Sequence, residues 1–173
     1  SGTYHGEDYL IVAARGHLYE YADPSEQVPD AYRDQYHSWR VENLPWDETL
    51  FSWKRVKKKD VSSTLTAIKN ALAGCSEVVI ATDVDPTGEG ELLAWEILDE
   101  LHIRKKIFSR MYFVDESAKE LQKAFVNRKL LPAMEKDMDF VKARYRSQWD
   151  MLSMQFTRIA TSCANNMVIR QGR

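Results

Sequence analysis

Four acidic residues lie within nine positions of one another, at Asp83, Asp85, Glu89 and Glu91. Crowded carboxylates repel one another, and a bound cation is the usual remedy. Their oxygens suit a hard cation such as Mg²⁺, which binds one or two carboxylates, keeps several waters and bridges to phosphate oxygens. The simpler interpretation is that the aspartates form a turn and the glutamates complement a helix N-terminus. A lone Asp-x-Asp favours the turn, but four acids at one junction favour a metal site.

The residues around this acidic segment predict a strand, a turn and a helix. Residues 78–82 form a short apolar, β-branched run, which is typical of a buried strand. A helix is predicted from about Glu89 to Leu101. Its spacing places one set of side chains inward (Leu93, Ala94, Ile97, Leu98 and Leu101) and another outward (Glu96, Asp99 and Glu100).

A second strand at 107–114 and a helix that opens at 115–117 follow this unit. Strand, helix, strand and helix in this order predict an α/β fold with a parallel sheet flanked by helices. Ligands of such sheets bind at the carboxyl ends of the strands, and Asp83 and Asp85 lie at such an end.

Other segments carry weaker patterns. Residues 9–14 form an apolar run that predicts another buried strand, and residues 19–53 show no period and are expected to be irregular. Asp60 is the expected N-cap of a helix that ends at Gly74. That helix is expected to bury Leu65, Ile68 and Leu72. After Pro132 one apolar face predicts a long helix, so we expect an α/β domain over 1–128 and the start of a helical domain over 129–173.

Composition limits the class of protein. The 173 residues suffice for one well-buried domain, and no apolar run approaches the ~20 residues that span a bilayer. Ser1-Gly2 has the character of an expression-tag remnant. Cys75 and Cys163 are far apart without metal-ligand spacing, so a reduced, cytoplasmic chain is expected. The net charge of −2 excludes a protein that wraps nucleic acid by bulk positive charge, but not local DNA contacts.

Three further places are candidates for contact with a nucleic acid. His17 follows Gly16 at a predicted strand end, where it serves either a turn or a phosphate. Residues 53–59 combine one tryptophan with five cations and suit a DNA backbone, although exposed basic loops are common. Arg146 and Asp150 are four residues apart on the long helix. They form either a surface ion pair or a contact site for a DNA strand.

The stretch from Ile80 to Trp95 resembles the Toprim signature of type IA DNA topoisomerases, a strand followed by Asp-x-Asp, Arg-Glu-Gly-Glu and a helix. Arg15-Gly-His-Leu18 resembles the family's Gly-His strand end. Residues 29–32, Tyr36, Trp39 and 43–45 resemble the segment that follows in topoisomerase III. Arg146 to Asp150 and Thr157-Arg158 resemble the family's later Arg-x-x-x-Asp and Thr-Arg motifs. The resemblance therefore covers most of the chain.

This resemblance implies a Toprim domain with a Rossmann-like sheet over residues 1–128. It implies a parent enzyme that cleaves one DNA strand, passes a strand through the break and reseals it. Asp83, Asp85 and Glu89 would form the acidic site for Mg²⁺, with Mn²⁺ as an alternative. His17, Arg146 and Asp150 would contact DNA, chiefly single-stranded segments.

The sequence departs from the family at several points. Pro86-Thr87 stands where the family has Arg-Glu, so Glu89, which matches the family's final glutamate, becomes the expected third acid. The first strand with its Glu-Lys-Pro-Ser motif and the nucleophilic tyrosine of a later domain are not recognised here. The chain is therefore expected to be a fragment without activity of its own.

Helix geometry separates the two glutamates. Positions 89 and 91 differ by about 200° around a helix, so both cannot face the aspartates. Because Leu93 and Ile97 mark the inward side, Glu89 is expected to face the site and Glu91 to be solvated. Two rival functions remain: a primase- or nuclease-like Toprim protein, and a degenerate Toprim module that only binds DNA or a partner.

Overall fold

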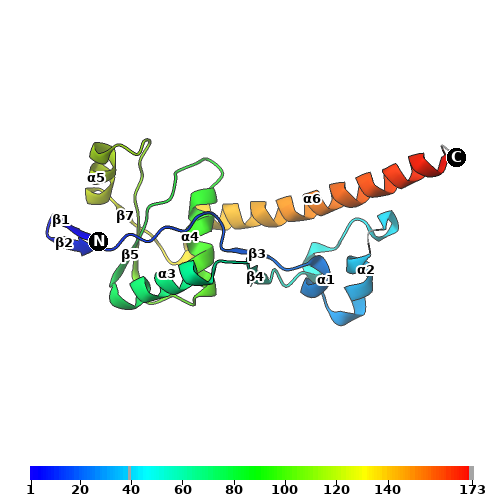
Figure 1. The fold of residues 1–173 in the computed structure, drawn as a ribbon, viewed down its shortest axis with the longest axis horizontal. Coiled ribbons are helices and arrows are strands. Elements are labelled where there is room, and N and C mark those ends of the chain that lie inside the picture. The colour runs from blue at the N-terminus through cyan, green and yellow to red at the C-terminus, as the bar shows by residue number, and fades with distance from the viewer. Residues whose placement is uncertain (39, 172–173) are drawn as a thin grey trace. The chain divides into compact units, whose positions relative to one another are not determined.

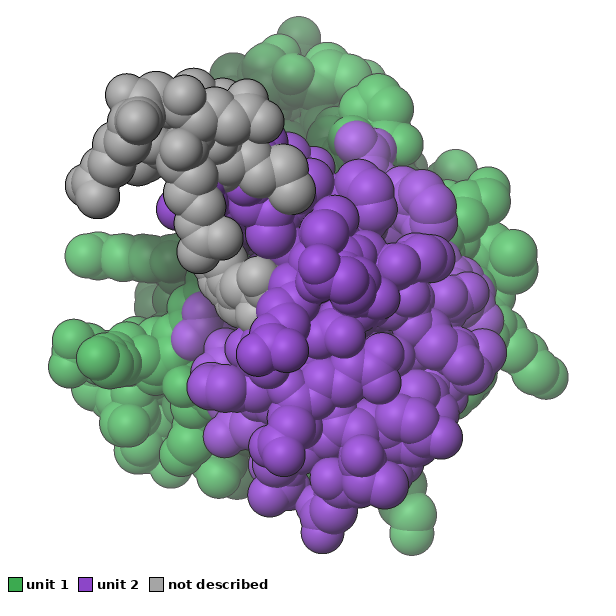
Figure 2. Space-filling view, turned by 90° about the vertical axis from the view of Figure 1, so that its right-hand side faces the viewer, with its two compact units in different colours: residues 1–19, 57–144 green, residues 20–56, 145–173 purple. Residues whose placement is uncertain are grey.

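The computed structural model describes residues 1–38 and 40–171 (Figure 1). Trp39, one of the residues that carry the resemblance, lies outside these ranges. Two compact units alternate along the chain: unit 1 contains residues 1–19 and 57–144, and unit 2 contains residues 20–56 and 145–173 (Figure 2). Within the described ranges, no helix combines the length and the apolar character that crossing a membrane requires.

A three-stranded sheet forms the centre of unit 1. Strand β5 (Glu77–Ile80) pairs in parallel with β6 (Ile107–Arg110), and α4 (Glu89–Glu100) connects them. This is the predicted strand–helix–strand unit, and the α/β fold is confirmed. The sheet is mixed rather than wholly parallel, because β7 (Lys129–Leu130) pairs with β6 in the antiparallel direction.

Two further helices of unit 1 agree with the sequence in place but not in every boundary. Helix α5 (Ala118–Val126) is capped by the Ser117 hydroxyl, which accepts a hydrogen bond from the Glu120 backbone N–H. Helix α3 (Ser62–Gly74) ends at the expected glycine. The expected cap at Asp60 is wrong, because that residue has a left-handed φ of 61° and the helix begins two residues later.

The strand predicted at residues 9–14 is wrong. Strands β1 (Gly2–Tyr4) and β2 (Glu7–Tyr9) form a hairpin instead, and residues 10–15 have no regular secondary structure. Leu10 and Ile11 are 59% and 77% exposed. An apolar run becomes a strand only where another strand pairs with it, and the described β5–β6–β7 sheet does not include this segment.

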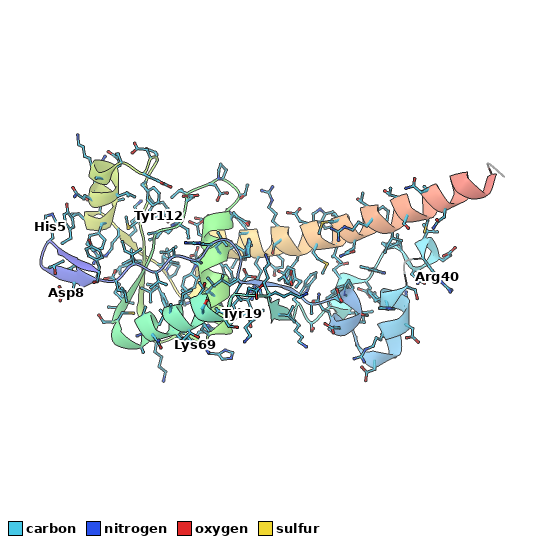
Figure 3. The ribbon with its side chains drawn as sticks, in the orientation of Figure 1. His5, Asp8, Tyr19, Arg40, Lys69 and Tyr112 are labelled. Carbon is cyan, nitrogen blue, oxygen red and sulfur yellow. The ribbon has the colours of Figure 1, made fainter. Side chains whose placement is uncertain are left out.

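Helix α4 is buried on more than one side. Leu92, Trp95 and Leu98 pack into the main cluster of unit 1, together with Ile80 and Phe108. Ile97 of α4 packs into a separate cluster of the same unit. The buried members of this cluster are Leu18, Tyr19, Leu65 and Ile97 (Tyr19 is labelled in Figure 3). The sequence assumed one inward stripe, so the burial of Trp95 was missed and the outward orientation predicted for Glu96 is wrong.

Helix α6 (Met138–Gln171) is the predicted long helix. Asp137 lies immediately before the helix, and its buried carboxylate accepts hydrogen bonds from the Trp95 indole at 2.7 Å and from the backbone N–H of Asp139 at 3.2 Å. Phe140, in its first turn, is fully buried in the main cluster of unit 1. In unit 2 the fully buried Ile159 packs with that unit's own cluster.

The first chain segment of unit 2 is mostly irregular, as predicted, but it contains short helices. These are α1 (Pro24–Gln27), α2 (Arg33–His37) and the 3-10 turns η1 (Asp30–Tyr32), η2 (Val41–Asn43) and η3 (Glu48–Leu50). β3 (Tyr19–Tyr21) pairs with β4 (Arg55–Lys57). The core of the unit is aromatic: Tyr36 stacks on Trp46, and Phe51 stacks on Trp53.

Candidate functional site

The turn between β5 and α4 holds Asp85 firmly. One carboxylate oxygen of Asp85 accepts hydrogen bonds from the backbone N–H of Thr87 at 2.7 Å and from the Thr87 hydroxyl. The other accepts the backbone N–H of Gly90 at 3.2 Å. The Thr87 hydroxyl is the main cause of a lowered pKa of Asp85, and slight burial opposes it. Asp85 therefore stays ionised while it shapes the turn.

Asp83 is exposed on the same turn. Its backbone carbonyl accepts a hydrogen bond from Arg110 Nη2 at 2.9 Å. Among the described residues, its carboxylate has no hydrogen-bond or ion-pair partner. This carboxylate is therefore available to a ligand, whereas that of Asp85 already accepts three hydrogen bonds.

Two glycines bring α4 close to neighbouring backbone. Gly88 has a left-handed φ of 75°, and a Cβ at this position would lie 3.0 Å from the Asp139 carbonyl oxygen. A Cβ at Gly90 would lie 2.0 Å from the Asp83 carbonyl oxygen, closer than any side chain tolerates. These two glycines therefore let the start of α4 lie close to the acidic turn and to α6.

Glu89, the first residue of α4, points toward a histidine. Its Oε1 lies 2.5 Å from Nε2 of His17, and Nδ1 of the same ring lies 2.8 Å from Oε2 of Glu96. The hydrogen bond with Glu96 is the main cause of a raised pKa of His17, and burial of the ring opposes it. Both ring nitrogens thus face carboxylates, so a phosphate contact by His17 would require displacing one of them.

The solvated position predicted for Glu91 is wrong. Glu91 is 4% exposed, and its Oε1 lies 2.8 Å from Nε of Arg110. Glu91, Trp95 and Leu98 have i, i+4 and i+7 spacing, and all three lie on a buried face of α4. The predicted stripe included Leu98 but missed that α4 is also buried on the side that carries Glu91 and Trp95.

Arg110 is a buried residue beside the acidic turn that the sequence interpretation missed. It ends β6, it is completely buried, and it donates to Glu91 and to backbone carbonyls at the end of β5. One signal was available: an arginine inside a predicted buried strand must find a carboxylate or several carbonyls. The sequence did not indicate which carboxylate.

The donor set fits a cation held by few protein ligands. Among residues 1–38 and 40–171, no three His, Cys, Asp or Glu side chains are arranged to hold a metal ion. The three acids expected to converge are therefore not assembled, because Glu89 is engaged with His17. Asp83 and Asp85 remain on one turn with oxygen ligands, and Mg²⁺ is commonly held by one or two carboxylates with water completing its shell.

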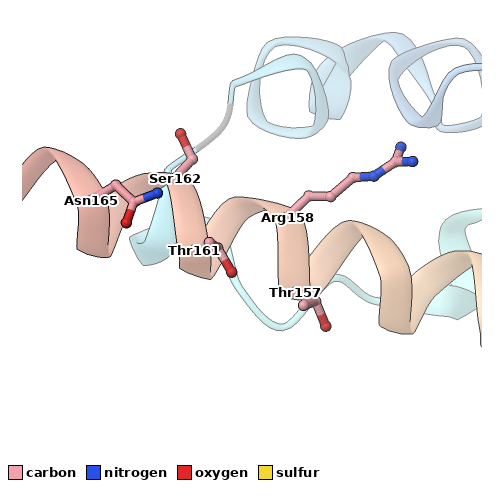
Figure 4. Close-up of a pocket in the computed structure, with 5 residues that line it drawn as sticks. All are labelled: Thr157, Arg158, Thr161, Ser162 and Asn165. Carbon is pink, nitrogen blue, oxygen red and sulfur yellow. The ribbon is translucent and has the colours of Figure 1, made fainter.

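The DNA-contact candidates on α6 belong to unit 2. Nε of Arg146 lies 3.7 Å from Oδ2 of Asp150, and both side chains are well exposed. Such pairs contribute little stability and leave the guanidinium accessible. Further along α6, polar side chains line a shallow hollow of about 410 Å³: Thr157, Arg158, Thr161, Ser162 and Asn165 (Figure 4).

The basic segment 53–59 includes a cation–π contact that the sequence did not predict. The Arg55 guanidinium carbon lies 5.9 Å from the centre of the Tyr21 ring. Arg55 is partly buried, in contrast to the exposed Lys57. The segment is therefore not uniformly a solvated basic loop.

Comparisons with known proteins agree with the motifs. Residues 2–115 match the Toprim domain family. The chain is 30% identical over 168 residues to DNA topoisomerase 3 of Bacillus subtilis, covering 95% of this chain and 22% of that protein. It is 31% identical over 169 residues to DNA topoisomerase 3 of Bacillus anthracis, covering 95% and 21%. DNA topoisomerase 1 of Synechocystis sp. is 33% identical over 128 residues, covering 72% and 13%.

The chain thus spans about a fifth of the length of the DNA topoisomerase 3 relatives. The matched region contains the Asp-x-Asp turn, the parallel strand that precedes it and the helix that follows it. The resemblance to type IA DNA topoisomerases is confirmed, and this chain belongs to the Toprim domain family.

Proposed function

We propose that this chain is the metal-binding part of a type IA DNA topoisomerase, with residues 1–128 as the Toprim domain and 129–173 as the start of a helical domain. The observation that carries the proposal is the accessible Asp83 carboxylate beside the fixed Asp85, at the carboxyl end of a parallel strand. The complete enzyme would cleave one DNA strand with a tyrosine from another domain, pass a strand through the break and reseal it.

Asp83 and Asp85 would hold Mg²⁺, or Mn²⁺ in its place. The cation would supply positive charge beside a DNA phosphate during transesterification. Asp85 is suited to this role because its lowered pKa keeps it ionised. Asp83 is suited because its carboxylate has no competing partner among the described residues.

Glu89 is the proposed third acid. Its side chain is 53% exposed at the start of α4, where the helix dipole favours an anion. Glu91 is unsuited to the role, because it is buried and neutralised by Arg110. To join the cation or one of its waters, Glu89 would exchange its contact with Nε2 of His17. Arg146 and Asp150, on the exposed surface of α6, would contact a single-stranded segment of the DNA.

Calorimetry with Mg²⁺ tests the metal site. We expect weak binding by the wild type and its loss in the Asp83→Asn, Asp85→Asn double variant; equal heats in the two proteins would refute the proposal. The chain alone is expected neither to relax nor to cleave supercoiled plasmid. Relaxation that persists through repurification would contradict the fragment interpretation.

Two observations favour a second candidate, a Toprim module that binds DNA or a partner without catalysis. Pro86 and Thr87 replace the family's Arg-Glu, and the described acids do not form a three-ligand group. Metal titration separates the candidates, because a non-catalytic module would show no Mg²⁺ heat that depends on Asp83 and Asp85.

A further inference from the structure

A buried guanidinium lies directly beneath the acidic turn. Arg110 Nη1 donates to the carbonyl oxygens of Thr82 at 2.5 Å and Ile80 at 3.3 Å, and Nη2 donates to that of Asp83 at 2.9 Å. Its Nε lies 2.8 Å from the Glu91 carboxylate. One side chain therefore connects the end of β5, the acidic turn and helix α4.

The sheet itself does not hold this part of the chain. The last backbone hydrogen bond between the two parallel strands joins the Met111 N–H to the Ile80 carbonyl at 2.9 Å. Beyond Ile80 the chain leaves the sheet, and Arg110 takes the place of a neighbouring strand for the carbonyls of Thr82 and Asp83. These two contacts are partly buried, and a fully buried carbonyl without a partner would cost about 1–3 kcal/mol.

We propose that Arg110 is a positioning residue of the acidic site: it fixes the backbone of Thr82 and Asp83, and so the direction in which the Asp83 carboxylate leaves the turn. This inference rests on the proposed metal-binding function. Arg110 itself is completely buried, so it acts only through the turn.

A second set of contacts fixes the same turn from the helix side. The Thr82 hydroxyl donates to the Gly90 carbonyl at 2.7 Å, and the Gly90 N–H donates to Asp85 at 3.2 Å. Gly90 also leaves no space between α4 and the Asp83 carbonyl. These contacts fix the positions of both aspartates relative to the first turn of α4. Arg110 contacts the same turn of the helix through Glu91.

Arg110 does not act on the acidic site through its positive charge. Glu91 lies beside it and is equally buried, so the pair adds no net charge below the aspartates. A lysine would keep the positive charge, but a single ammonium cannot reach the same spread of acceptors as the planar guanidinium. Arg110→Lys therefore removes the positioning and preserves the charge.

Arg128 provides a matched control in the same unit. It lies next to β7 and contacts Glu77 at the opposite end of β5, with Nε 2.9 Å from Oε1 and Nη2 3.0 Å from Oε2. Its side chain is mostly buried, and it also pairs with Glu7. Arg128→Lys disturbs a comparable ion-pair network without touching the acidic turn.

The experiment measures Mn²⁺ binding by the electron paramagnetic resonance signal of the free ion, using the complete natural protein. Arg110→Lys is expected to lower the affinity by about tenfold, as loss of an outer-sphere partner commonly does. Arg128→Lys should leave it within about twofold. The Mn²⁺ concentration that gives half-maximal plasmid relaxation should rise in Arg110→Lys, with activity recovered at saturating Mn²⁺; a merely structural role would not give this recovery.

The outcomes separate the two proposals. Mn²⁺ binding that survives the Asp83→Asn, Asp85→Asn double substitution would refute the proposed function. Binding that depends on both aspartates but is equally affected by Arg110→Lys and Arg128→Lys would overturn the positioning role. If Arg110→Lys does not fold, Thr82→Val takes its place, because it removes the hydroxyl oxygen that accepts a hydrogen bond from Arg110 Nη1 at 3.2 Å. Thr66→Val on α3 is its control. Weaker Mn²⁺ binding only in Thr82→Val supports the inference, and equal binding overturns it.

Discussion

Nδ1 of His17 lies 2.8 Å from Oε2 of Glu96, a glutamate that the helical pattern of the sequence had assigned to solvent. The carboxylate is buried on α4, and the imidazole brings it a hydrogen bond from a segment 79 residues earlier in the chain. The contact therefore stabilises the fold as well as the start of α4, where Nε2 of the same ring meets Glu89.

His17→Ala should lower the free energy of unfolding by about 1–3 kcal/mol, because it removes the imidazole from the buried Glu96 carboxylate. Denaturant unfolding followed by circular dichroism measures the change. His37→Ala is the control, because His37 is exposed at the end of α2. Equal stability of the two variants would contradict the assigned contact.

Glu91→Gln should mainly lower stability, whereas Glu89→Gln should mainly lower activity. Glu91→Gln removes the charge that compensates the buried Arg110, and should cost about 3 kcal/mol of stability. Glu89→Gln, which is half-exposed, should cost less than about 1 kcal/mol but reduce Mg²⁺-dependent relaxation by the complete enzyme. Unfolding and relaxation are measured on both variants. A stable Glu91→Gln protein without activity would make Glu91 the functional acid instead.

Gly90→Ala should displace the acidic turn. The added methyl would lie 2.0 Å from the Asp83 carbonyl oxygen, so either the turn or α4 must move. We expect a lower midpoint of thermal unfolding and loss of Mg²⁺ heat in calorimetry. Gly74→Ala is the matched control, because its methyl would meet nothing within 4 Å and alanine favours a helix. A Gly90→Ala protein that binds Mg²⁺ normally would show that the turn tolerates the shift.

Glu77 should contribute stability that is lost in acid. Hydrogen bonds from Arg128 are the main cause that lowers the pKa of Glu77 below its ordinary value of 4.5, while burial opposes them. A lowered folded-state pKa contributes stability that is complete above pH 4.5 and is lost as the pH falls through the folded-state pKa. The difference in unfolding free energy between wild type and Glu77→Gln should therefore shrink in acid. A difference that stays constant down to about pH 3 would contradict this assignment.

Local patterns predicted the elements around the site, but not their burial. The segment from Val78 to Leu101 was predicted well because a β-branched run, a turn and a helical period are all short-range signals. The faces of α4 were not, because the rule of one apolar stripe fails for a helix that packs into two clusters. Glu91 and Glu96 were assigned to solvent for that reason alone.

The hydrophobic periodicity of the sequence could not predict side-chain partners that are far apart along the chain. Arg110 and His17 find their carboxylates 19 and 79 residues away, and nothing in a linear period encodes these pairings. The strand predicted at residues 9–14 was wrong for a related reason, because whether this apolar run pairs depends on another strand and not on its own residues.

The two ends of helix α6 depend on different cores. Asp137 and Phe140 fix its start in unit 1, while Ile159 fixes its later turns in unit 2. Between these anchors Tyr145 and Trp149 are 62% and 70% exposed. Starting a helix is costly and extending it is not, so each anchored stretch can serve as a nucleus for the other. Amide hydrogen exchange along α6 should consequently be slowest near both anchors and fastest between them, so that one continuous helix opens as two separate folding segments.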